Sequence, residues 1–140
     1  MGGRGSGSGR GGGGGGLNTS GMQGTEKQVS WATDILNRYI SEFDKAVDDI
    51  KNDIRYGTNK EYTELAKSTV KQITSQKNKE ISAFNAGIKE KGLKASEVID
   101  RRAAFSADAR KITHGVMLRN GVTDGSKINS FIWHIRRIKK

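Results

Sequence analysis

The chain has 140 residues, a formal net charge of +10, and neither cysteine nor proline. The lack of cysteine excludes a disulfide framework, a thiol nucleophile and a cysteine-ligated metal site. No apolar run approaches the roughly 20 residues that span a bilayer, and no apolar segment typical of a secretory signal follows Met1. We therefore expect a soluble, cytoplasmic protein that does not contact a membrane.

The composition divides the chain into two parts. Thirteen of the 19 glycines lie within residues 1–24, and such glycine and serine runs are typical of flexible coil. We predict a flexible glycine-rich arm over 1–24 and a single helical domain over 25–140. The formal charge is −2 over 25–57, +3 over 58–92 and +7 over 93–140. Basic charge concentrated in this way indicates a polyanionic partner, with plain solubility as the alternative.

The first predicted helix begins at the N-cap Thr25 and ends at Gly57. The segment Thr25–Gln28 fits a capping box, in which the cap side chain and the third helical side chain each bind the other's backbone N–H. Apolar residues then recur at steps of three and four, as on one face of an amphipathic helix. This apolar stripe comprises Ala32, Ile35, Leu36, Tyr39, Ile40, Phe43, Val47, Ile50 and Ile54.

The second predicted helix begins with a second capping box, Thr58–Glu61, and ends at Gly92. A polar stretch over 74–80 interrupts its apolar pattern, so the sequence allows either one long helix or two helices with a kink near Gln76. The link between the first and second helices is short, which predicts an antiparallel hairpin.

Three shorter helices are predicted after the hairpin, over Ala95–Arg102, Ser106–His114 and Ser126–Ile138, with a loop over Val116–Thr123. A long hairpin has an apolar face that other elements must cover, and these helices are available to do so. The predicted fold class is therefore all-α: a long antiparallel helical hairpin covered by shorter basic C-terminal helices.

Residue types with catalytic or metal-binding chemistry are sparse. The two histidines, His114 and His134, lie far apart, and neither has a second ligand at metal spacing. Asp44 and Asp48 have i,i+4 spacing, which could hold a divalent cation. Exposed acidic faces of amphipathic helices have the same spacing, and we favour that interpretation. The glycine pattern Gly7–Gly12 follows no strand and therefore lacks the context of a dinucleotide-binding loop. We expect that the protein is not an enzyme and that it binds no cofactor and no metal. The alternative is an enzyme with a hidden site around His114.

Basic residues supply the candidates for binding. On the predicted last helix, Trp133 shares one side with basic residues, which combines stacking with phosphate contact; a solvated basic terminus is the alternative. Arg4 and Arg10 lie between glycines, as in sparse RGG-type segments or in a plain linker. The predicted contacts to nucleic acid or to a partner are Arg4, Arg10, Arg101, Arg102, Arg110, Lys111, Arg119, Lys127, Trp133, Arg136, Arg137, Lys139 and Lys140.

A resemblance to a group of small proteins adds to this interpretation. The segment Gly24–Ile35 reads GTEKQVSWATDI and resembles the opening G-[ST]-E-K-Q-x-x-W-A-x-x-I of small proteins and domains carried by bacteriophages and mobile elements. Those domains often have a later W-I-D-x-R element, and Val98–Arg102 is similar to it, with valine in place of the tryptophan. The resemblance covers about residues 24–102. It implies a phage or mobile-element origin and an action in a bacterial host cell, on host defence or on phage nucleic acid.

Charge and resemblance lead to one functional prediction. We predict a non-enzymatic phage accessory protein that binds nucleic acid, either RNA or DNA, or a nucleoprotein complex. Its most concrete form is an inhibitor of a host defence nuclease, such as an anti-CRISPR protein that engages a Cas nuclease. The basic charge argues against mimicry of DNA, which requires an acidic surface. The alternative is a structural or virion-associated helical protein whose hairpin serves homo-oligomerisation.

Overall fold

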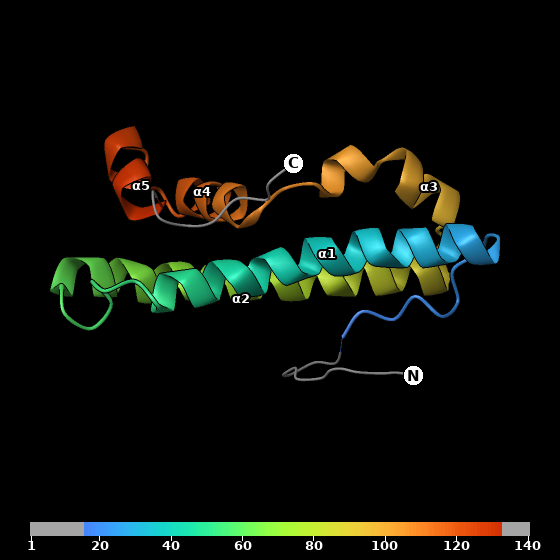
Figure 1. Ribbon diagram of the computed structural model, residues 1–140, viewed down its shortest axis with the longest axis horizontal. Coiled ribbons are helices and arrows are strands. Elements are labelled where there is room, and N and C mark those ends of the chain that lie inside the picture. Colours follow the sequence, from blue (N-terminus) through green and yellow to red (C-terminus); the bar gives the residue numbers. More distant parts are fainter. Residues whose placement is uncertain (1–15, 133–140) are drawn as a thin grey trace.

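The computed structural model describes residues 16–132, and this part of the chain forms the predicted all-α hairpin (Figure 1). Helices α1 (Glu26–Lys51) and α2 (Lys60–Glu90) lie side by side, and shorter helices cover one face of the pair. These are α3 (Ala95–Asp100), the 3-10 helix η2 (Arg102–Phe105), α4 (Ala109–Arg119) and α5 (Gly125–Ile132). None of the helices in residues 16–132 combines the length and apolar character needed to cross a membrane.

The N-termini of the two long helices are capped by side chains. At α1 the predicted capping box is confirmed, because the Gln28 N–H donates to the Thr25 hydroxyl and the Thr25 N–H donates to the Gln28 side chain, each at 3.1 Å. At α2 the cap is Asn59 rather than the predicted Thr58. The Asn59 side-chain oxygen accepts the Tyr62 N–H at 2.8 Å. The cap of α2 therefore lies one residue later than predicted.

The end of α1 differs from the prediction. The apolar stripe was expected to continue through Ile54 to Gly57, but the helix ends at Lys51, and Ile54 is 84% exposed. The reason is local, because the Asp53 carboxylate accepts the backbone N–H of Arg55 at 2.8 Å. Aspartate side chains that bind backbone two residues later favour turns over helices.

The alternative of one continuous second helix is confirmed. No break occurs over 74–80, and the Gln76 side chain donates to the Glu80 carboxylate at 2.8 Å, one helical turn further on. The chain leaves α2 near Gly92, which has a φ of +68°. Glycine adopts this left-handed conformation without the steric cost that a Cβ atom adds.

Helix α4 is longer than predicted. The helix was expected to end at His114 and a loop to follow over 116–123, but α4 continues through half of that loop, and Met117 is fully buried. Gly115 lies inside the helix and does not stop it. The stop is Gly121, which has a φ of +90°. The loop prediction is therefore wrong for the first part of its range.

Residues 16–24 pack on the hairpin, although their composition led us to place them in the flexible arm. Met22 is 6% exposed and belongs to an apolar cluster with side chains of α1, α2 and α3, and Leu17 packs against the same cluster. The Ala95 N–H donates to the Gln23 carbonyl at 2.8 Å, which joins this segment to the start of α3. The abundance of glycine concealed these two apolar anchors. The remainder of the predicted arm, residues 1–15, lies outside the described residues.

The core consists of two apolar clusters, one toward each end of the hairpin, and Tyr39 packs against both. Its ring lies edge-on to Phe43, Phe84 and Phe105, with centroids 5.3, 6.1 and 5.6 Å away. Aromatic rings in this arrangement attract one another beyond their burial of apolar surface. Phe105 comes from η2, so this contact fixes the segment between α3 and α4 on the middle of the hairpin.

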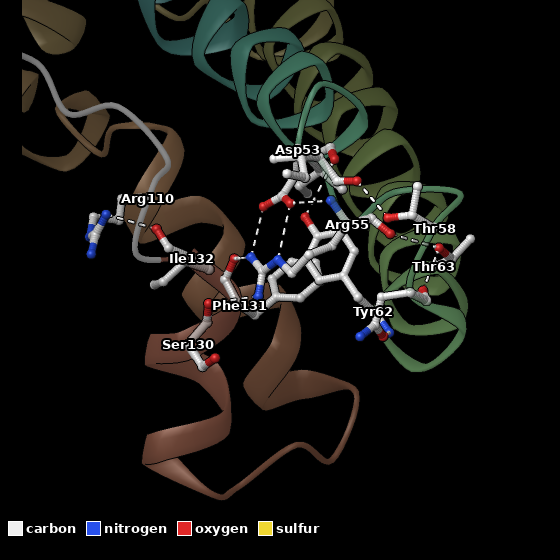
Figure 2. Close-up of polar contacts among 12 residues, drawn as sticks. Asp53, Arg55, Thr58, Tyr62, Thr63, Arg110, Ser130, Phe131 and Ile132 are labelled. Atoms are coloured by element: carbon white, nitrogen blue, oxygen red, sulfur yellow. Dashed lines mark hydrogen bonds and ion pairs between the residues drawn. The ribbon is translucent and has the colours of Figure 1, made fainter.

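Arg55, in the loop after α1, fixes the end of α5 (Figure 2). Its guanidinium pairs with the Asp53 carboxylate at 2.7 Å and lies 4.1 Å from the centroid of the Tyr62 ring. The same group donates to the carbonyl oxygens of Ser130 at 3.3 Å and Phe131 at 3.4 Å. One guanidinium thus joins the hairpin loop to α5.

Ionisation of the Tyr62 phenol is expected to lower the stability of the protein at alkaline pH. Burial raises its pKa above the ordinary value of 10.0, the Asp53 carboxylate raises it further, and Arg55 opposes the shift. The folded state therefore keeps a proton that the unfolded chain loses, so the stabilisation is present below about pH 10 and is lost as the pH rises further. In urea titrations above about pH 10, we expect the free energy of unfolding to fall more steeply for the wild type than for Tyr62→Phe. Equal slopes would contradict this assignment.

Candidate nucleic-acid interface

A cleft of about 650 Å³ lies between α1 and the segment that joins α3 to α4; we call it the Trp31–Arg102 cleft. One wall is a side of α1 that includes Ile35 of the apolar stripe. This wall includes Trp31, Ile35, Arg38 and Glu42, which lie on one side of the helix because they are spaced four, three and four residues apart. The other wall comes from η2, the following loop and the start of α4. That wall includes the side chains of Arg102, Phe105, Asp108 and Lys111.

Trp31 and Arg102 form the most distinctive contact of the cleft. Trp31 is 50% exposed, which is unusual for the largest apolar side chain. The Arg102 guanidinium carbon lies 5.5 Å from the centroid of the indole, within cation–π range. Arg102 also donates to the Ile99 carbonyl at 2.9 Å, which orients its side chain. The cleft therefore presents an open aromatic surface next to a positioned cation.

The cleft carries an excess of unpaired positive charge. Within residues 16–132, no carboxylate lies within ion-pair distance of Arg38, Arg102 or Lys111. The two carboxylates of the lining, Glu42 and Asp108, accept hydrogen bonds at the N-terminus of α4 instead. With three cations and these two carboxylates the lining has a formal net charge of +1, and a concave surface of this sign attracts anions.

Glu42 holds one wall of the cleft in place. Its carboxylate is 2% exposed, and its two oxygens accept the Ala109 N–H and the Lys45 ammonium, each at 3.0 Å. The first N–H groups of a helix lack partners within the helix, and the dipole favours an anion there. Glu42 thereby fixes the start of α4 against α1, and this sets the position of Lys111, two residues later in the first turn.

Aromatic side chains form the floor of the cleft. Phe105 lies 5.4 Å from Phe84 and packs edge-on to it, in addition to its contact with Tyr39. Burial raises the pKa of the Tyr39 phenol, Glu80 raises it further, and Arg119 opposes the shift. The hydroxyl is therefore protonated at neutral pH and adds no negative charge to the cleft.

The structure brings two of the predicted binding residues, Arg102 and Lys111, into this cleft. Arg101 and Arg119 are exposed but do not line it. Lys127 lines a separate, smaller cleft of about 240 Å³ beside α5. Only some of the predicted basic contacts therefore lie together in the Trp31–Arg102 cleft.

Arg110, another predicted contact, has a structural role. Its guanidinium donates to the Ile132 carbonyl at 2.7 Å, at the end of α5 (Figure 2). The remaining predictions, including the continuation of the last helix to Ile138, lie outside the described residues. These contacts are Arg4, Arg10, Trp133, Arg136, Arg137, Lys139 and Lys140.

Two residues of the cleft were missed by the sequence prediction, Trp31 and Arg38. Neither residue was among the predicted contacts. A signal was present, because Trp31 and Arg38 share a helix face with Ile35, a residue of the apolar stripe. The segments 24–35 and 98–102 also meet here, since Arg102 lies over the Trp31 ring.

Comparison of the chain with protein-family models, curated proteins and solved structures finds no match. The chemistry of the cleft is therefore our guide to function. An open indole and three cations without carboxylate partners combine the two kinds of contact that nucleic acid offers, stacking and phosphate binding. Within residues 16–132, no group of three or more histidine or acidic side chains is arranged to hold a metal ion.

Proposed function

We propose that the protein is a non-enzymatic phage accessory protein that binds nucleic acid, free or within a nucleoprotein complex, through the Trp31–Arg102 cleft. The observation that carries this proposal is the half-exposed Trp31 beside Arg102, with Arg38 and Lys111 nearby and no carboxylate pairing with these three cations in residues 16–132. Neutralising phosphates with such cations releases counterions, which supplies affinity without sequence preference.

The charge of the whole chain supports the same proposal. The net charge is +10, and +7 of it belongs to residues 93–140. A field of this sign steers polyanions toward the surface and speeds their association. The basic residues of the glycine-rich start and of 136–140 add to this charge; they lie outside the described residues, and we propose them as additional contacts from the sequence.

Binding to a fluorescent oligonucleotide tests the electrostatic part of the proposal. Measured by anisotropy between about 50 and 200 mM salt, the logarithm of the affinity is expected to fall linearly with that of the salt concentration. The double variant Arg102→Glu with Lys111→Glu reverses two charges at the cleft, and we expect it to bind at least about tenfold more weakly.

The matched control is Arg101→Glu with Arg119→Glu. It changes the net charge by the same amount at exposed positions outside the cleft, so we expect less than about a threefold loss. Equal losses in both double variants would assign binding to overall charge rather than to the cleft. Absence of any binding at low salt would overturn the proposal. A variant that lacks residues 1–15 retains the packed Leu17 and Met22 and isolates the contribution of Arg4 and Arg10.

Inhibition of a host defence nuclease, as by an anti-CRISPR protein, is the biological role that we propose from the resemblance to phage proteins. A pull-down from bacterial lysate, with and without added nuclease, distinguishes the partners. A partner lost after nuclease treatment is held through nucleic acid, whereas a retained one is bound through a protein surface. The structural or virion-associated alternative predicts a stable homo-oligomer free of nucleic acid, which light scattering detects.

A further inference from the structure

The geometry of the Trp31–Arg102 cleft points to a more specific ligand: we infer that it binds one unpaired base with its adjoining phosphates, the base inserting between the indole and the guanidinium. Single-stranded nucleic acid is then preferred over duplex. This inference rests on the proposed function, because it names the form of nucleic acid that the same site recognises.

The separation of the two side chains supports insertion. A planar base between the indole and the guanidinium needs about 7 Å, which is twice the optimal contact distance of about 3.5 Å. The observed 5.5 Å is too long for a tight stack of the two groups and too short for a base. Arg102 is exposed on a long side chain, and moving its guanidinium away from the indole requires the bond to the Ile99 carbonyl to lengthen or break. A displacement of about 1.5 Å of this flexible group opens the site.

The structure of a duplex excludes it from the same contact. Its volume of about 650 Å³ falls in the range of sites for small ligands. A duplex presents phosphates and base edges to a protein, and its base faces are covered by neighbouring pairs. Stacking on Trp31 is therefore available to an unpaired base and not to a paired one.

Cations on both walls lie where the adjoining phosphates would run. Arg38 follows Trp31 by seven residues on the same face of α1, which places it about 10 Å further along the helix. Lys111 comes from the opposite wall, where Glu42 holds the start of α4. A strand whose base enters the cleft thus meets positive charge on either side of the backbone.

An acidic polypeptide is the competing ligand, since it too carries negative charge. Its carboxylates would use the three cations but leave the half-exposed indole without a partner. Sequence-tolerant stacking on an aromatic side chain is, by contrast, a general property of bases. The open Trp31 ring therefore favours nucleic acid.

Anisotropy with four labelled probes of equal length tests the inference on the full chain. The probes are oligothymidylate, an abasic deoxyribose-phosphate strand, a duplex and polyglutamate. We expect oligothymidylate to bind at least about tenfold more tightly than the other three. Trp31→Ala is expected to reduce its affinity to that of the abasic strand, whereas Trp31→Phe, which retains a ring for stacking, loses only part of it. Circular dichroism verifies that both variants are folded.

The outcomes separate the inference from the proposed function. Equal affinity for oligothymidylate and the abasic strand, or tighter binding of the duplex, would overturn the inference and leave binding through phosphates intact. Failure of every nucleic-acid probe to bind would overturn both. Polyglutamate binding as tightly as oligothymidylate would assign the cleft to acidic polypeptides and overturn both as well.

Discussion

Replacing Glu42 with alanine is expected to lower the free energy of unfolding by about 3 kcal/mol. The substitution removes a carboxylate that is 2% exposed and leaves the Ala109 N–H without the acceptor that it has now. The start of α4 then loses its attachment to α1. Because Lys111 lies in the first turn of α4 and lines the cleft, we also expect weaker oligonucleotide binding.

Two control variants separate the helix contact from the ion pair. Glu42→Gln retains an oxygen that can accept the Ala109 N–H, so we expect a loss of about 1 kcal/mol. Lys45→Ala removes the ion-pair partner, whose side chain is 55% exposed, and we expect less than about 0.5 kcal/mol. Urea titration measures all three variants. A loss for Lys45→Ala as large as that for Glu42→Ala would show that the ion pair, and not the contact to α4, carries the stabilisation.

The hairpin was predictable because its signals are local. The capping box at Thr25 and the apolar stripe that follows are set by hydrogen bonds and side chains within a few residues of each other. The ends of helices were less predictable. Gly115 and Gly121 look alike as sequence, yet one lies within α4 and the other ends it. The difference comes from tertiary packing, because Met117 is buried only if the helix continues.

The candidate site was predictable in its charge but not in its geometry. Arg102 and Lys111 belong to the most basic part of the chain, and composition alone identified them. Trp31 lies in an acidic segment, and its pairing with Arg102 depends on how α3 and η2 fold back on α1. A site assembled from distant segments follows from packing of the whole fold, which local patterns do not encode.

Stability and binding are expected to separate in a second variant, Arg55→Ala. The substitution removes the ion pair to the Asp53 carboxylate, whose side chain is 5% exposed. It also removes the contacts to the Tyr62 ring and to α5. We expect a loss of about 3 kcal/mol in the free energy of unfolding, together with faster hydrogen exchange in α5. Arg55→Lys keeps the charge without the forked geometry, so its loss is intermediate.

The matched control for Arg55 is Arg110→Ala, which removes the other guanidinium contact to α5, the bond to Ile132, and is expected to cost about 1 kcal/mol. A smaller loss for Arg55→Ala than for Arg110→Ala would contradict the role assigned to the Arg55 contacts.

The Trp31–Arg102 cleft is built from α1, η2 and the start of α4, and α5 contributes nothing to its lining. Folded Arg55→Ala protein should therefore bind oligonucleotide within about twofold of the wild type, in contrast to Glu42→Ala, which weakens both stability and binding. Parallel losses of binding in the two variants would mean that the interface extends to α5.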